Sequence, residues 1–144
     1  MHRPRRVMET FHRAKDIEKQ TVENSAYRKS LKTFEYSQVI VQSLNPDEDI
    51  PWEMHPDLDQ FFRVEQGQGL VQVQSREDPS KVSATMMNDG DWFVVPAGHK
   101  HRVSNASKTA PFKLYTVYCG KPGHPKGVFQ ARQSSKETYI CEEG

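Results

Sequence analysis

The chain has 144 residues, with 20 Lys and Arg against 19 Asp and Glu, so its formal net charge is +1. This length fits one domain. The near balance of charge excludes a positive field over the whole molecule as the basis of function. Nucleic acid is therefore not an expected partner. No apolar run approaches the roughly 20 residues that span a bilayer, so a membrane is not expected either. The basic start has no apolar stretch behind it, and we expect a cytoplasmic protein without a secretory signal.

Basic residues are concentrated at the start of the chain. Residues 1–32 contain nine Lys and Arg against four acids. Residues 1–19 are predicted to form a basic N-terminal arm that is helical or disordered. A short helix over residues 10–19 is indicated by three apolar residues at helical spacing, Phe11, Ala14 and Ile17.

After the arm the hydrophobic pattern changes to a period of two, which is typical of β-strands. Gly67-Gln68-Gly69 lies between two such runs and predicts a hairpin there. Short strands separated by frequent turns predict an all-β antiparallel sandwich or barrel over residues 20–130, followed by a polar tail over residues 131–144. The predicted strands are residues 38–44, 61–65, 70–74, 81–86, 92–95, 101–105 and 112–118.

Two segments carry residues suited to metal binding. In the first, Glu53 and His55 are two positions apart, so they face the same side of an extended chain, and Gln60 follows across a short turn. An acid, an imidazole and an amide oxygen that converge in this way could hold a divalent metal. In the second segment, His101 follows a tight turn at residues 96–98.

The second segment resembles the second motif of the cupin superfamily, G-x5-P-x-G-x2-H-x3-N. Every fixed position is present, as Gly90, Pro96, Gly98, His101 and Asn105. The first segment resembles a variant of the first cupin motif, in which Glu53 stands for the first histidine, His55 is the second, and Gln60 stands for the glutamate.

A closer resemblance, over about residues 20–130, is to the small single-domain cupins often labelled mannose-6-phosphate-isomerase-like. It is carried by residues 23–28, 55–65, 95–98 and 113–118. This resemblance implies a double-stranded β-helix, that is, a jelly-roll barrel, with the site inside the barrel mouth. It does not name a reaction, because one fold hosts many functions.

A metal held by Glu53, His55, Gln60 and His101 would have two nitrogen and two oxygen ligands and no thiolate. Such a set suits zinc, iron, manganese, nickel or cobalt. Four protein ligands would leave one or two positions open for water or a small-molecule ligand, as a catalytic site requires.

Three functions remain open at this point. The first is a metal-dependent isomerase-like enzyme acting on a sugar or sugar phosphate, and the second is a non-heme iron dioxygenase. The third is a non-catalytic module that binds a ligand or partner. For the isomerase, the candidate general bases are Asp57, Asp59 and His99, and a phosphate anchor would be Arg63 or Lys113. A homodimer is also expected, because small sandwiches often leave edges that pair.

Overall fold

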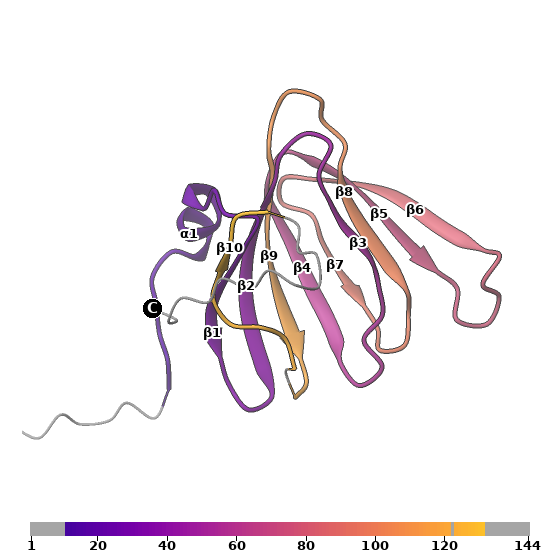
Figure 1. The fold of residues 1–144 in the computed structure, drawn as a ribbon, viewed down its shortest axis with the longest axis horizontal. Helices are drawn as coiled ribbons and strands as arrows, with labels where there is room; N and C mark the ends of the chain where they lie inside the picture. The colour runs from indigo at the N-terminus through magenta and orange to yellow at the C-terminus, as the bar shows by residue number, and fades with distance from the viewer. Residues whose placement is uncertain (1–10, 122, 132–144) are drawn as a thin grey trace, which may run out of the picture.

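The computed structural model describes residues 11–121 and 123–131. They form ten strands and one short helix, so the predicted all-β fold is confirmed (Figure 1). The elements are α1 Ile17–Glu23, β1 Arg28–Thr33, β2 Ser37–Leu44, β3 Asp49–Glu53, β4 Asp59–Gln66, β5 Gln68–Gln74, β6 Val82–Asn88, β7 Trp92–Val95, β8 His101–Asn105, β9 Phe112–Cys119 and β10 Val128–Phe129.

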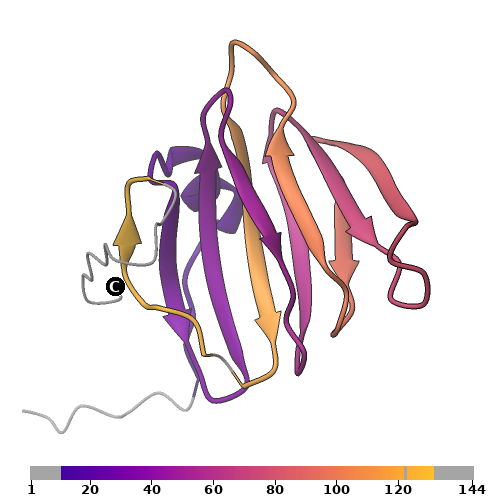
Figure 2. The same cartoon turned by 45° about the vertical axis from the view of Figure 1, so that its right-hand side comes forward.

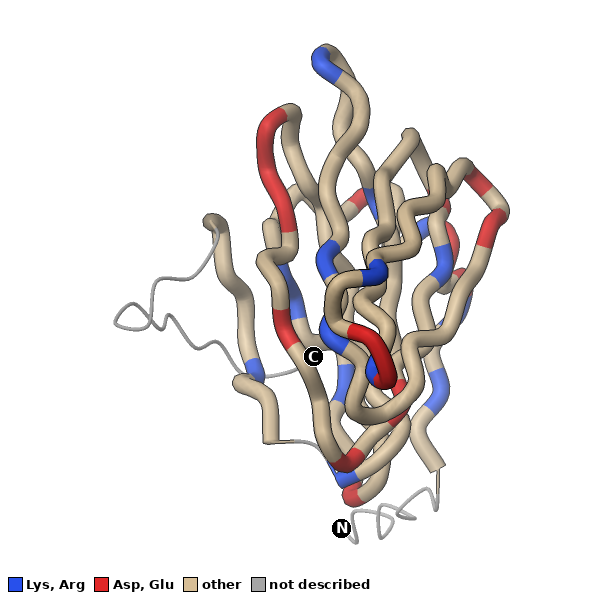
Figure 3. Tube along the Cα trace, turned by 90° about the vertical axis from the view of Figure 1, so that its right-hand side faces the viewer, with Lys and Arg blue, Asp and Glu red and all other residues tan. Residues whose placement is uncertain are grey.

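The strands form two antiparallel sheets that face each other. One has six strands in the order β10-β1-β2-β9-β4-β7, and the other has four in the order β3-β8-β5-β6. The four-stranded sheet lies over the β9, β4 and β7 side of the larger sheet, and the β5–β6 hairpin projects beyond it (Figures 1 and 2). Viewed from the β6 side, Lys and Arg are interspersed with Asp and Glu over the molecule (Figure 3).

Alternating residues of the facing strands fill the space between the sheets. Phe62 and Val64 of β4 and Leu114 of β9 pack with Val71 of β5 and Val103 of β8 in one core cluster. Burying side chains of this size contributes roughly 1.5–3 kcal/mol each. The period of two seen in the sequence is therefore the pattern of one buried and one exposed face.

Each of the seven strands predicted from the sequence is present. The strands β1, β3 and β10 were not predicted. The buried positions of β1 include Arg28 and Ser30, so its inward face is polar, and β3 contains Pro51, which weakens a strand pattern. Their pairing with β2 and β8 makes them strands, and that pairing is a long-range property.

The hairpin predicted at Gly67-Gln68-Gly69 is wrong. Strands β4 and β5 belong to different sheets, so the chain crosses between the sheets at this point. Gly67 has φ +86°, and a Cβ there would lie 2.4 Å from the carbonyl oxygen of Pro111. The two glycines permit a close approach of the crossing chain to the start of β9, which local pattern alone does not distinguish from a hairpin turn.

The helix predicted over residues 10–19 is also misplaced. It spans Ile17–Glu23, because the side chain of Asp16 accepts a hydrogen bond from the Lys19 amide (3.0 Å) and caps the helix start. Phe11 and Ala14 precede the helix and are exposed. Helix α1 packs over β2, β9 and β4 on the outer face of the six-stranded sheet, where Lys113 Nζ donates to the Val22 carbonyl.

Among the described residues, no helix combines the length and the hydrophobicity needed to cross a bilayer. Cys119 is a free, exposed thiol. The first ten residues of the predicted basic arm and the predicted polar tail after residue 131 lie outside the described residues.

Candidate metal centre

Glu53 and His101 are brought together by strand pairing. Glu53 is the last residue of β3 and pairs with His101, the first residue of β8. Residues directly opposite each other in an antiparallel pair project from the same face of the sheet. The sheet therefore places the carboxylate and the imidazole side by side at one end of the sandwich.

His55 follows the end of β3 and is held by a backbone contact between the two motif segments. The amide of Gly98 donates to the His55 carbonyl (2.8 Å). Gly98 has φ +83°, in the left-handed region that glycine adopts at little cost. The turn at residues 96–98 therefore fixes the chain on which His55 lies as well as the start of β8.

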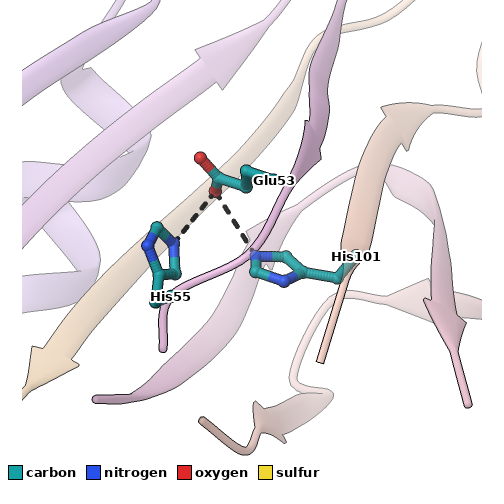
Figure 4. A group of neighbouring side chains, drawn as sticks. All are labelled: Glu53, His55 and His101. Carbon is teal, nitrogen blue, oxygen red and sulfur yellow. Dashed lines mark ion pairs between the residues drawn. The ribbon is translucent and has the colours of Figure 1, made fainter. Parts of the chain in front are cut away.

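The three side chains converge on a small volume (Figure 4). Glu53 Oε1 lies 3.4 Å from His55 Nε2 and 3.3 Å from His101 Nε2. The three candidate ligand atoms all lie within 4.8 Å of one another. The arrangement expected from the sequence, with both histidines at one point, is therefore present.

The orientation of His101 is set by its own backbone. His101 is fully buried, and its Nδ1 lies 3.0 Å from the His99 carbonyl oxygen. Because a carbonyl only accepts, Nδ1 carries the proton in this contact, and the lone pair of the neutral ring is on Nε2. This is the tautomer that a metal-binding histidine uses when its other nitrogen donates to a carbonyl.

The environment favours the charged form of Glu53. Burial raises the pKa of this carboxyl, but the hydrogen-bonding and electrostatic effects of His101 and His55 outweigh it and lower the pKa to about 2. Glu53 is therefore a carboxylate at neutral pH, as a metal ligand must be.

Gln60 lies on β4 of the facing six-stranded sheet and is not part of the cluster of Glu53, His55 and His101. It is 2 % exposed, and its Nε2 donates to Thr116 Oγ1 (2.9 Å). This bond fixes the amide so that Oε1 is the free end, and Oε1 is buried without a hydrogen-bond partner. Gln60 pairs with Tyr118, whose ring contacts His55 at a centroid distance of 5.4 Å, so the amide lies beside the cluster.

The unpartnered atoms fit a metal ion. His55 Nε2, His101 Nε2 and Gln60 Oε1 are buried and make no hydrogen bond of regular geometry, although both imidazole nitrogens face the Glu53 carboxylate. Nitrogen and oxygen ligands about 2.1 Å from zinc stand about 3.4 Å apart at a tetrahedral angle. The distances of Glu53 Oε1 to the two histidines are 3.4 and 3.3 Å, so one ion could contact all three residues.

Two aromatic neighbours of the cluster lie outside the ligand set predicted from the sequence. His124 stacks on Tyr118 with a centroid distance of 3.9 Å and contacts His55 at 4.7 Å. Burial, together with His55 and Arg28, lowers the pKa of His124 to about 4, and burial raises the pKa of Tyr118. Tyr118 could have been found, because it is in register with the buried Leu114 and Thr116 of its strand. His124 follows the last long strand in a loop and carries no such signal.

The three general bases predicted from the sequence lie outside the cluster of Glu53, His55 and His101. Asp59 accepts from the Ala97 amide, and the His99 ring faces the carbonyls of the turn at residues 96–98. Asp57 is exposed. None of these side chains belongs to the three-residue cluster.

The candidate anchors are also placed elsewhere. Arg63 alternates with the buried Phe62 and Val64 and pairs with Glu65, and Lys113 is bonded to α1. The arginine near the cluster is instead Arg28 of β1, which lines a cavity of about 180 Å³ together with Glu53 and His124.

Two facing antiparallel sheets with a histidine and glutamate cluster at one end define a β-sandwich with a candidate mononuclear metal site. The chain belongs to the cupin family, because the cupin domain model (Cupin_2) matches residues 40–118. The matched segment runs from β2 to β9 and contains Glu53, His55, Gln60 and His101.

Similar proteins occur in a virus and in bacteria. The chain is 35% identical over 118 residues to uncharacterized protein L612 of Acanthamoeba polyphaga mimivirus, covering 82% of this chain and 71% of that protein. It is 40% identical over 113 residues to uncharacterized protein YrkC of Bacillus subtilis, covering 78% of this chain but only 59% of that protein. The crystal structure of BH2720 from Bacillus halodurans is similar at a TM-score of 0.73 and 38% identity, covering 85% of this chain and 89% of that one.

Proposed function

We propose that this cupin binds one divalent metal ion through Glu53, His55, Gln60 and His101 and acts on a small polar molecule at that ion. The observation that carries the proposal is the convergence of Glu53 Oε1, His55 Nε2 and His101 Nε2 within 4.8 Å of one another, with both imidazole nitrogens buried. A fold that holds a carboxylate and two buried imidazole nitrogens this close together is best explained by a bound ion. Zinc, iron, manganese, nickel and cobalt all suit this ligand set.

An isomerase-like reaction on a sugar or sugar phosphate is one form of this activity. A divalent ion polarises a hydroxyl or carbonyl of its ligand, which eases proton transfer between neighbouring carbons. The resemblance to mannose-6-phosphate-isomerase-like cupins supports this form. The general base would come from His124, since its ring lies against His55.

Iron-dependent oxygen chemistry is the second candidate. It is favoured by the composition of the cluster itself, because two histidines and one carboxylate with open positions are the ligand set of non-heme iron oxygenases. In this case Gln60 would be a weak fourth ligand or would hydrogen-bond to the bound substrate.

Elemental analysis of the purified protein tests the proposal. We expect about one metal ion per chain in the wild type and loss of that ion in His101→Ala and His55→Ala. His99→Gln is the matched control, because its side chain faces the adjacent turn instead of the cluster. The proposal fails if the wild type takes up no zinc, iron, manganese, nickel or cobalt after dialysis, or if His101→Ala retains the ion.

Two activity assays then separate the functions. Proton exchange beside a sugar carbonyl would support the isomerase, and oxygen uptake with iron would support the dioxygenase. A protein that holds one metal ion and gives neither signal would be a ligand-binding module instead of an enzyme.

A further inference from the structure

Arg28 is a buried cation without a buried anion to balance it. It is 7 % exposed, and none of the ion pairs found among the described residues includes it. Its Nη1 donates to the Pro125 carbonyl (2.8 Å), but Nη2 is buried with no hydrogen-bond partner. Burying a charge costs several kcal/mol unless it is paired, so this arrangement needs an explanation.

A structural role accounts for only part of the guanidinium. The contact with Pro125 and the position over the Phe129 ring, 5.6 Å from its centroid, tie Arg28 to the segment that leads into β10. The contact with Pro125 uses Nη1, and the contact with Phe129 uses the flat face of the guanidinium group. They leave Nη2 without a hydrogen bond of regular geometry, on a residue that lines the cavity and also interacts with Tyr118.

The cavity joins Arg28 to the candidate metal centre. Its volume is about 180 Å³, and its described lining residues include one arginine, Arg28, and one acid, Glu53. Glu53 contributes one negative charge and Arg28 one positive charge, so a divalent ion at the triad would leave the site with a net charge of about +2. A ligand that fills the cavity would therefore be favoured if it is an anion.

We propose that the Arg28 guanidinium binds the carboxylate of a small organic acid, another oxygen of which reaches the metal held beside Glu53. This inference rests on the proposed metal site. Guanidinium donors match carboxylate oxygens in charge and direction. The cavity is smaller than the 300–1,000 Å³ typical of drug-sized ligands, so the acid has few carbon atoms. A phosphate would ordinarily need several donors, and Arg28 is the only Lys or Arg among the described residues that line this cavity.

A cobalt-loaded protein provides the test, because the visible absorption of Co²⁺ reports changes in its coordination. The probes are lactate, malonate and acetate, with lactamide as the neutral counterpart of lactate and inorganic phosphate as the competing anion. We expect a saturable spectral change with at least one of the acids. Lactamide should bind at least tenfold more weakly than lactate, and phosphate should bind more weakly than the best acid.

The variants isolate the charge of Arg28. Arg28→Met should weaken binding of the acid about 10- to 100-fold, the loss expected for a hydrogen bond to a charged group. Arg28→Lys keeps the charge and should keep a preference for lactate over lactamide. Arg63→Met removes an arginine that pairs with Glu65 and lies on the other face of β4, so it should behave as wild type. Circular dichroism and Co²⁺ stoichiometry check that each variant is folded.

Several results would overturn the inference. It fails if none of the three acids changes the spectrum, if lactamide matches lactate, if phosphate binds most tightly, or if Arg28→Met binds acids like the wild type. If the wild type binds no Co²⁺, the proposed metal site fails separately. Binding of the acid is then measured on the metal-free protein by its melting temperature. An acid should raise the melting temperature of the wild type and not that of Arg28→Met.

Discussion

Metal-dependent stability is the property most directly set by the cluster of Glu53, His55 and His101. An ion that binds only the folded state stabilises it by about 2.7 kcal/mol at a metal concentration 100 times the dissociation constant. For a chain of 144 residues this corresponds to a rise of about 10 °C in melting temperature. We expect that rise between EDTA-treated and metal-loaded wild type.

Replacing His101 by alanine should remove most of this rise. If losing this ligand weakens metal affinity 100-fold, the same metal concentration is only about equal to the new dissociation constant. The metal then stabilises the fold by only about 0.4 kcal/mol, and the melting temperature rises by only about 1–2 °C. The buried imidazole also leaves a cavity when removed, which lowers stability by itself. Comparing each variant with and without metal cancels that cost.

Differential scanning fluorimetry with zinc, manganese, cobalt, nickel and iron(II) in turn measures the two shifts. His99→Gln should retain the wild-type shift, since its ring is outside the cluster. An equal shift in His101→Ala and wild type would refute the reasoning. So would a wild type whose melting temperature is the same with each of the metals and with EDTA.

Three further predictions concern the fold. Phe62→Ala should cost about 3–5 kcal/mol in urea unfolding, because the ring is fully buried and stacked on Phe93, whereas Phe34→Ala, at a half-exposed ring, should cost far less. Gly67→Ala should destabilise more than Gly123→Ala, which has open space for a Cβ, and equal urea midpoints would contradict the strain assigned to Gly67. Strand β6 is an edge strand without charge or proline, exposed along nearly its whole length, so we expect a homodimer paired through it. Sedimentation should then show a dimer that Ala84→Lys converts to monomer, and a monomeric wild type would count against this edge.

Much of the fold was predictable from local pattern. Strands such as β4, β5 and β9 alternate buried and exposed residues along the chain, so hydrophobicity alone reveals them. His101 was predictable for a related reason, because the glycines and proline that shape the preceding turn are visible in the sequence. The misplaced helix was a local error, in which the cap at Asp16 outweighed the spacing of Phe11 and Ala14.

The remaining features of the fold and of the candidate site depended on which strands became neighbours. The sequence determined seven of the ten described strands, the turn before His101 and most of the candidate metal ligands. The tertiary structure decided that the chain crosses between sheets at Gly67, and that Tyr118, His124 and Arg28 gather near Glu53. The physical reason is that side-chain alternation is a property of one strand, whereas the register between distant strands is set by burial and hydrogen bonding of the whole sheet.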